Sequence, residues 1–348
     1  MLERSSIVNG GRSNSLYQWV RGHPITENKG RKIPLPHTPE GGFVTICVAA
    51  IAGGNCIYGA SDRMITAWTT EFEPNEPQLE KVLPQPLKSI ALSNSIVAMI
   101  AGDDMSLQSQ LIYDLGYIVS ERIKKDQQNW WTVSDIAHQY RRLYGFKRNQ
   151  IIEQKILEPR GLTYETFLSK QRELDEKFLA TAHSEIARFR LPDLAVIFAG
   201  IDPTGAHLYV VRNGEVACED LVGFAAIGSG YWHAESQFMA TGHTKHSSLS
   251  SAVYVTYAAK RRAELAPGVG RGTDMFGIGP QLGSYFPIAP SIIGEFETIY
   301  EAAQKSAKKA WEKEKTSIQK LMTKWAKEAE EKAKTQTSGE GGSTPIAS

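Results

Sequence analysis

Two stretches in the first third of the chain decide its fold. Residues 43–66 read FVTICVAAIAGGNCIYGASDRMIT, and residues 88–104 read KSIALSNSIVAMIAGDD. In the first stretch, two short apolar runs at 44–51 and 56–60 flank a Gly-Gly-Asn turn, which predicts a hairpin of buried strands. The second stretch carries another apolar run at 96–101, which predicts a third strand.

Polar side chains stand at the ends of these predicted strands. Thr45 lies at the start of the first strand, and Asp62 lies at the end of the second. Lys88 precedes the third strand, which closes on Gly102. A Thr, an Asp, a Lys and a Gly thus follow one another in this order at the ends of the predicted strands.

Composition and charge narrow the function classes. The length of 348 residues suits one large domain with appendages, and a net charge of +1 predicts neither nucleic acid nor an acidic membrane as a partner. The three cysteines form no CxxC pattern or cluster with histidines, so we expect no metal, no cofactor and no disulfide framework. The chain has no bilayer-length apolar run and no secretory signal, so a cytoplasmic protein is expected.

Residues 1–42 are rich in Gly, Ser, Pro and Arg and have little apolar sequence. This composition predicts a disordered leader. A propeptide is an alternative, and so is a translation start near Val44, which would give a chain beginning Met-Thr-Ile-Cys-Val. These three interpretations are left open by the sequence.

After Gly102 the apolar spacing becomes helical. Apolar residues at intervals of three and four predict a helix from 105 to 125, and a second helix is expected over 133–150. The following segment, 151–190, is predicted to be a helical insertion with a break at Pro159-Arg160-Gly161. Its main element is expected to be one long helix over 164–189.

Strands return after the insertion and are followed by another helical region. The turn signals Pro203-Thr204-Gly205 and Asn213-Gly214 separate predicted strands at 194–202, 207–214 and 215–230. Helical spacing follows at 231–239 and 249–265, and a last strand is expected at 273–279. Strands, two helices, strands and two helices in this order predict an α+β fold with antiparallel sheets.

A charged amphipathic helix is predicted over 291–334, and a disordered tail over 335–348. Trp311, Ile318 and Trp325 recur every seven residues along this helix. The stripe suits packing either on the parent domain or on another copy. Two heptads are too few for a coiled coil, so packing on the parent domain is favoured.

The order Thr45, Asp62, Lys88 and Ala101-Gly102-Asp103 resembles the proteasome β-subunit family of Ntn (N-terminal nucleophile) hydrolases. The likeness is greatest to bacterial proteasome-type proteins that begin Met-Thr-Val-Cys and carry an SDRM-like strand end. It covers about 42–280. The resemblance implies a four-layer αββα sandwich over 43–290, with the helical insertion at about 151–190.

The resemblance also implies a chemistry for Thr45. In this family an amino-terminal threonine is the nucleophile, and its own α-amine, with an unperturbed pKa of about 7.7 to 8.0, can act as the base. A threonine inside a chain lacks that base, so Thr45 can react only after everything before it is removed. The expected reaction is attack on an amide carbonyl, giving an acyl-enzyme that water releases. A β-branched residue filling a strand position is the structural alternative.

The other matching residues take supporting roles in the same resemblance. Lys88 would stand beside the nucleophile, and Asp62 would hold Lys88 charged and oriented. The backbone N–H of Gly102 would stabilise the oxyanion. Ser229, in Gly228-Ser229-Gly230, matches a serine that hydrogen-bonds near the amine, although a Gly-Ser-Gly turn also serves as a plain helix cap.

Two features depart from the family pattern. Near 263–270, where β-subunits carry an Asp and a Ser, this chain offers Glu264 in place of the Asp and no serine follows. Val44 precedes Thr45 where self-processing β-subunits have Gly. A β-branched residue there hinders autocatalytic release of Thr45.

The sequence therefore supports two functions from different classes. The first is a threonine-type amidohydrolase or peptidase, a proteasome β-subunit-like hydrolase acting on a peptide or another amide. The second is a catalytically inactive proteasome-like scaffold subunit. Both predict a homo-oligomer, either a ring or a dimer, and neither predicts a nucleic-acid or membrane partner.

Overall fold

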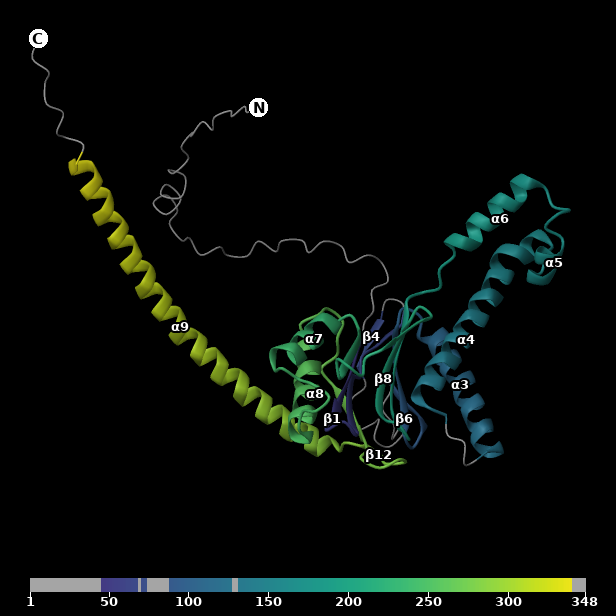
Figure 1. Ribbon diagram of the computed structural model, residues 1–348, viewed down its shortest axis with the longest axis horizontal. Coiled ribbons are helices and arrows are strands. Elements are labelled where there is room, and N and C mark those ends of the chain that lie inside the picture. The colour runs from purple at the N-terminus through teal and green to yellow at the C-terminus, as the bar shows by residue number, and fades with distance from the viewer. Residues whose placement is uncertain (1–44, 68–69, 74–87, 127–130, 340–348) are drawn as a thin grey trace, which may run out of the picture. The chain divides into compact units, whose positions relative to one another are not determined.

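The computed structural model describes residues 45–67, 70–73, 88–126 and 131–339 (Figure 1). The leader predicted at 1–42 lies outside the described residues, and so does the end of the predicted tail.

The first sheet contains the predicted hairpin. Its strands are antiparallel throughout and lie in the order β10 (Phe224–Gly228), β1 (Ile46–Ala52), β2 (Cys56–Asp62), β11 (Thr273–Ile278) and β12 (Tyr285–Pro287). Gly53 and Gly54 form the β1–β2 turn with φ of 58° and 76°, a left-handed conformation that glycine adopts without steric cost. The hairpin predicted from 44–60 is confirmed.

The second sheet carries the remaining long strands, again all antiparallel. The order is β5 (Ser89–Ser93), β6 (Ile96–Gly102), β7 (Leu194–Asp202), β8 (Gly205–Arg212) and β9 (Glu215–Cys218). Asn213 and Gly214 both have positive φ in the β8–β9 turn, as the Asn-Gly signal predicts. A separate two-stranded ribbon is formed by β3 (Ile65–Ala67) and β4 (Thr70–Phe72).

The strand predicted over 215–230 is two strands in different sheets. The chain leaves the second sheet after β9, turns at 219–223 and enters the first sheet as β10. The Asp220 carboxylate accepts a hydrogen bond from the Leu208 N–H, and Gly223 has a φ of 82°. A polar turn with a left-handed glycine therefore interrupts what looked like one strand.

The helices and sheets are stacked in the order helix, sheet, sheet, helix (Figure 1). Three apolar layers lie between them and hold them together. One layer joins the second sheet to α3 (Met105–Lys125) and α4 (Val133–Ile152). The middle layer lies between the sheets, and the third joins the first sheet to α7 (Tyr231–Ala240) and α8 (Leu249–Ala263). The predicted α+β class with antiparallel sheets is confirmed.

Burial on both faces explains the continuous apolar runs that mark the strands. In β6, Val97, Met99 and Ala101 face the other sheet, whereas Ile96, Ala98 and Ile100 face the helices. A strand covered on both sides has no polar face, so its sequence does not alternate.

The insertion is helical, but it is not built on one long helix. A π-helical turn (Glu153–Leu157) and a 3₁₀ turn (Glu158–Arg160) follow α4, and then come α5 (Tyr164–Ser169) and α6 (Glu176–Arg188). The prediction of a single helix over 164–189 is wrong because Asp175 accepts hydrogen bonds from the Lys177 and Phe178 N–H groups and starts a new helix. The insertion has a small apolar cluster of its own around Ile156 and Phe167.

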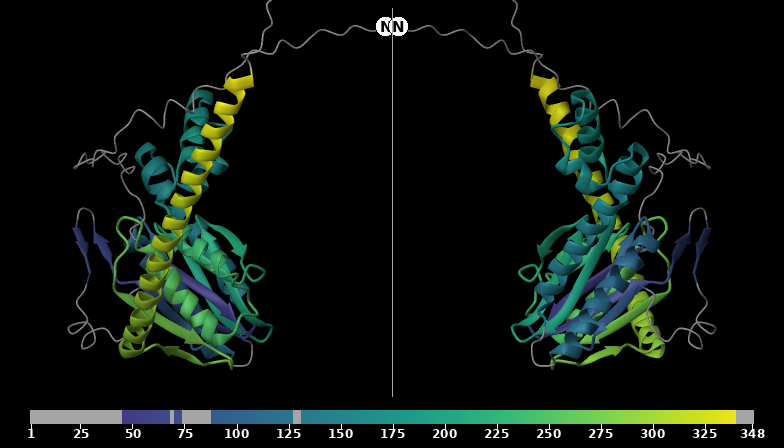
Figure 2. Two further views of the ribbon diagram at one scale, coloured as in Figure 1. Left: turned by 90° about the vertical axis from the view of Figure 1, so that its left-hand side faces the viewer. Right: turned by 90° about the vertical axis from the view of Figure 1, so that its right-hand side faces the viewer.

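The last helix, α9 (Pro290–Gly339), extends past the predicted end at 334. Its first turns pack on the third layer through Ile293, Phe296 and Tyr300. Further along, Trp311, Ile318 and Trp325 are 63%, 51% and 60% exposed. The favoured expectation that this stripe packs on the parent domain is therefore wrong for these three residues, since the described residues leave them uncovered. The helix is yellow in both views of Figure 2.

None of the helices within the described ranges has both the length and the apolar character needed to cross a membrane.

Replacing Gly228 with alanine tests how closely β10 approaches the start of β1. A Cβ on Gly228 would lie 2.0 Å from the Thr45 carbonyl oxygen, and the φ of Gly228 is 103°. We expect Gly228→Ala to lower the free energy of unfolding by at least about 2 kcal/mol, as overpacking adds to backbone strain. The measurement is urea denaturation followed by circular dichroism.

Gly54→Ala is the matched control, because Gly54 has a φ of 76° and nothing within 4 Å of its Cβ position. Gly54→Ala adds backbone strain without a steric clash, so we expect it to lower the free energy of unfolding by about 1 kcal/mol. Equal losses for the two variants would contradict the close approach at Gly228.

Candidate active site

Thr45, Asp62 and Lys88 meet in one buried polar cluster. The Lys88 Nζ donates to the Thr45 Oγ1 at 2.5 Å and to the Asp62 Oδ1 at 2.7 Å. Thr45 is 4% exposed, Asp62 0% and Lys88 2%. Three residues that the sequence spreads over 45–88 thus form one continuous hydrogen-bonded unit.

The local folding of the two sheets brings these residues together. Thr45 directly precedes β1, and the β1–β2 register continues to place Asp62 beside Ile46, whose N–H donates to the Asp62 Oδ1 at 2.9 Å. Lys88 directly precedes β5 of the other sheet, and its carbonyl accepts the Ile100 N–H from β6 at 2.9 Å. Its side chain therefore crosses from one sheet to the other.

The Asp62 carboxylate is satisfied on both oxygens. Oδ1 accepts from Lys88 and from the Ile46 N–H, while Oδ2 accepts from the Gly270 N–H at 3.1 Å and the Met64 N–H at 3.3 Å. Three backbone N–H groups and an ammonium supply the compensation that a buried carboxylate requires. Asp62 is therefore the point at which β1, β2, Lys88 and the loop before β11 are joined.

Cys47 lies close to the cluster but does not compete with Thr45 as a nucleophile. Burial raises the pKa of the Cys47 thiol well above its ordinary value, and the nearby positive charge of Lys88 only partly opposes this. The thiol points to the Ile100 carbonyl oxygen at 3.4 Å. Cys47 is a neutral thiol in the core, as expected for a buried cysteine.

Ser229 directly follows β10, as Thr45 directly precedes β1. The β1–β10 ladder ends with the pair Ile46 and Gly228, so Thr45 and Ser229 are the residues that directly flank its last pair. The Ser229 Oγ is buried and has no hydrogen-bond partner within the described ranges. Buried hydroxyls usually have a hydrogen-bond partner, so a binding role for the Ser229 Oγ stays a prediction.

Gly102 ends the strand that supports Lys88. Ile100, two residues earlier, bonds to both the Lys88 carbonyl and the Cys47 thiol. A Cβ on Gly102 would come within 2.8 Å of the Asp193 carbonyl oxygen. Packing against Asp193 is therefore enough to require glycine here, and an oxyanion role for its N–H stays a prediction.

Glu264 makes its contacts away from Thr45. Its Oε1 accepts from the Lys260 Nζ at 2.8 Å and lies 3.3 Å from the Arg261 Nε. The fully buried Lys260 also donates to the carbonyls of Gly270 at 3.0 Å and Arg271 at 2.7 Å. The Gly270 N–H donates to Asp62. Glu264 is therefore linked to the cluster through Lys260 and the loop that precedes β11.

Lys260 was missed by sequence reasoning. Burial lowers the pKa of its ammonium, and the Glu264 carboxylate is the main influence opposing that shift. The sequence does contain a signal: Lys260 falls on the buried face of α8, and the Gly-rich segment 268–272 follows soon after. Lysine is almost never fully buried without a partner, so such a position implies an ion pair.

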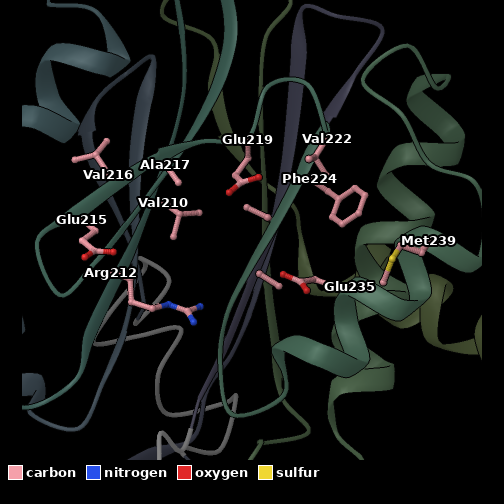
Figure 3. Close-up of a pocket in the computed structure, with 12 residues that line it drawn as sticks. Val210, Arg212, Glu215, Val216, Ala217, Glu219, Val222, Phe224, Glu235 and Met239 are labelled. Carbon is pink, nitrogen blue, oxygen red and sulfur yellow. The ribbon is translucent and has the colours of Figure 1, made fainter.

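A separate pocket of about 530 Å³ opens between β8, β9, β10 and α7 (Figure 3). Its walls include the charged side chains of Arg212, Glu219 and Glu235. Burial raises the pKa of Glu235. The positive charge of Arg212 opposes this rise in pKa, and the negative charge of Glu219 adds to it. Thr45 does not line this pocket, so it is distinct from the Thr45 cluster.

The cluster holds several groups that acyl transfer uses, but the base, a free α-amine on Thr45, is absent while Val44 precedes it. It presents a hydroxyl in contact with a buried ammonium, a carboxylate that fixes the ammonium, and a neighbouring serine hydroxyl. The positive charge of Lys88 stabilises negative charge on the Thr45 oxygen. Within the described ranges, no group of His, Cys, Asp and Glu is arranged to hold a metal ion.

Comparison with protein-family models and with curated proteins finds no match to this chain. A function for this chain is therefore inferred from the geometry of the cluster and from the resemblance of its residues to the β-subunit pattern.

Replacing Asp62 with asparagine should be more damaging than replacing Lys88 with methionine. In Asp62→Asn, Lys88 is left as a buried ammonium without a carboxylate, and the new amide N–H₂ faces the Gly270 and Met64 N–H groups. We expect a loss of about 3 to 5 kcal/mol in the free energy of unfolding. Denaturant titration is the measurement.

Lys88→Met should cost less, because Asp62 keeps three backbone donors. The double variant should lose less than the sum of the two single losses, since both belong to one network. Additive losses would show that Asp62 and Lys88 do not act as a pair.

Replacing Lys260 with methionine tests the link from Glu264 to Asp62. Without the ammonium, the carbonyls of Gly270 and Arg271 lose their donor, and the Gly270 N–H should be held less firmly on Asp62. Amide hydrogen exchange at Gly270 is expected to accelerate at least about tenfold. Arg262→Met, at an exposed position on the same helix, is the control and should leave that rate unchanged.

Proposed function

We propose that this chain is a threonine-nucleophile amidohydrolase of the Ntn type, similar to a proteasome β-subunit, with Thr45 as the attacking residue. The observation that carries the proposal is the buried contact of the Lys88 ammonium with both Thr45 and Asp62. The helix–sheet–sheet–helix order of layers is compatible with the αββα sandwich of such enzymes. The substrate class is a peptide or another amide, and the proposed compartment is the cytoplasm.

In the proposed reaction, the free α-amine of Thr45 accepts the proton of Oγ1 as that oxygen attacks the amide carbonyl. The Lys88 ammonium stabilises the attacking oxygen, and Asp62 keeps the ammonium in place. The Gly102 N–H would stabilise the oxyanion. The carbon–nitrogen bond then breaks, the leaving amine takes the proton, and water hydrolyses the threonine ester.

The residues around Asp62 support a modified role for Glu264. A carboxylate held by Lys260 and Arg261 is not free to bind the threonine amine. In this proposal Glu264 acts through Lys260 to position the loop before β11, and the Gly270 N–H of that loop donates to Asp62. The Ser229 hydroxyl is the nearby group proposed to bind the amine.

The competing proposal is a catalytically inactive scaffold subunit. Two observations favour it: Thr45 is preceded by Val44 in this chain, and Glu264 is engaged elsewhere. A peptide nitrogen cannot act as the base, so a chain that keeps Val44 would have no reaction at Thr45. Such a protein would act through assembly with copies of itself.

The test compares three chains that differ only at the start of the domain. One begins at Thr45 after cleavage of a removable fusion partner, one retains Val44, and one begins with alanine in place of Thr45. Hydrolysis of a set of fluorogenic peptide amides is measured. We expect turnover only from the first chain, with a loss of at least about 10³-fold in kcat/KM for the others.

A Lys88→Met chain beginning at Thr45 completes the set. It should fold, keep the threonine and lose activity, because the charge beside Oγ1 is gone. Equal activity in all four chains would place hydrolysis elsewhere, and no activity in the first chain would favour the scaffold.

A further inference from the structure

The far part of α9 carries an apolar stripe that no described residue covers. Trp311, Ile318, Met322 and Trp325 are 63%, 51%, 61% and 60% exposed. Two tryptophans and two long aliphatic side chains along one face of a helix form an apolar surface that a free monomer rarely exposes. The stripe therefore needs a partner.

The stripe continues a surface that is already an interface. Near its start, Phe296 and Tyr300 pack on Tyr257 of α8, with ring centroids 5.8 and 6.1 Å apart. Steps of three and four residues carry the same face from Tyr300 to Ala307 and on to Trp311. Only the near end of this face is covered by the domain.

The spacing of the exposed part is symmetric about Ile318. Trp311 and Trp325 lie seven residues away on either side, and Ala307 and Ala329 lie eleven residues away. Steps of seven and of eleven residues each return to within about 20° of the same side of an α-helix, so these residues share one face. A two-fold axis through Ile318 would place each tryptophan against the other tryptophan of a second copy, which is how a self-complementary interface is built.

We propose that α9 pairs antiparallel with α9 of a second copy of this chain, crossing at Ile318. The distribution of charge supports this direction. Residues 305–315 contain five lysines and two glutamates, whereas 321–331 contain two lysines and three glutamates. An antiparallel pair sets these unlike segments opposite each other, while a parallel pair sets the lysine-rich segment against itself.

Glu314 distinguishes a protein partner from a lipid surface. It lies inside the stripe, four residues before Ile318, and its counterpart across the two-fold axis is Met322. In an antiparallel pair, Lys324 of the partner follows close by and offers an ammonium. At a membrane surface the same carboxylate would be pressed into the apolar boundary without a partner.

Disulfide trapping in the full chain tests the proposal. The background is Cys218→Ser, because Cys218 is exposed while Cys47 and Cys56 are buried. Single cysteines are placed at 307, 318 or 329 by Ala307→Cys, Ile318→Cys or Ala329→Cys, and each protein is oxidised alone or in a mixture. Denaturing electrophoresis without reductant reports the covalent dimers.

An antiparallel pair predicts a specific pattern. Ile318→Cys cross-links alone, because its two copies meet at the axis. Ala307→Cys and Ala329→Cys do not cross-link alone, since each lies about 33 Å from its own copy. A mixture of these two proteins does cross-link. Cross-linking of all three proteins alone would show a parallel or random contact, and cross-linking of none would overturn the proposal.

Sedimentation equilibrium gives a second, independent readout. Trp311→Glu combined with Trp325→Glu should raise the dimer dissociation constant at least about 100-fold. Thr316→Glu combined with Thr323→Glu adds the same charge to the opposite face and should change it by less than about threefold. A monomeric parent protein, or one that only floats with phosphatidylserine vesicles, would contradict the proposal. Neither readout depends on the reactivity of Thr45.

Discussion

The structure around the candidate site depends on one buried carboxylate. Asp62 binds the Lys88 ammonium and the N–H groups of Ile46 and Gly270, so it ties both sheets and the loop before β11 to one point. A buried ion pair costs several kcal/mol in desolvation, which the hydrogen bonds must offset. An apolar replacement would often be as stable, so this polar cluster is not explained by the needs of the core alone.

The same carboxylate relates the site to its surroundings. Lys260 carries the network from Gly270 to Glu264, so groups on α8 influence how Asp62 is held. The lysine of the cluster and the lysine of α8 are both buried, and each stands next to one carboxylate. Two such pairs joined by one loop surround Thr45 with hydrogen-bonded groups, and a nucleophile and its charge partner need neighbours that hold them in place.

Sequence reasoning predicted the parts of this fold that depend on local pattern. The hairpin of β1 and β2 and the strand β6 follow from apolar runs that end at turn residues. The grouping of Thr45, Asp62 and Lys88 came from family resemblance, since spacing along the chain cannot show that Lys88 crosses between sheets. Composition could not reveal the division of 215–230, because two short strands with a polar turn resemble one irregular strand.

The predictions for Glu264 and for α9 differ from the structure in the contacts that the side chains make. Glu264 was placed in the site because of its position in the family pattern, whereas Lys260, one helical turn earlier, captures it in the structure. The stripe of α9 was assigned to the parent domain because two heptads are few, yet its apolar residues beyond Tyr300 lie away from that domain. In both cases the contacts of a side chain depend on which residues the fold brings close to it, and the sequence pattern does not show this.

The most direct test of the central claim is the intact mass of the protein isolated from the cells that naturally make it. The account predicts a chain that begins at Thr45, because only that chain has the α-amine needed as base. A mature protein that retains Val44 would contradict it, and would make the buried cluster a structural feature of a scaffold.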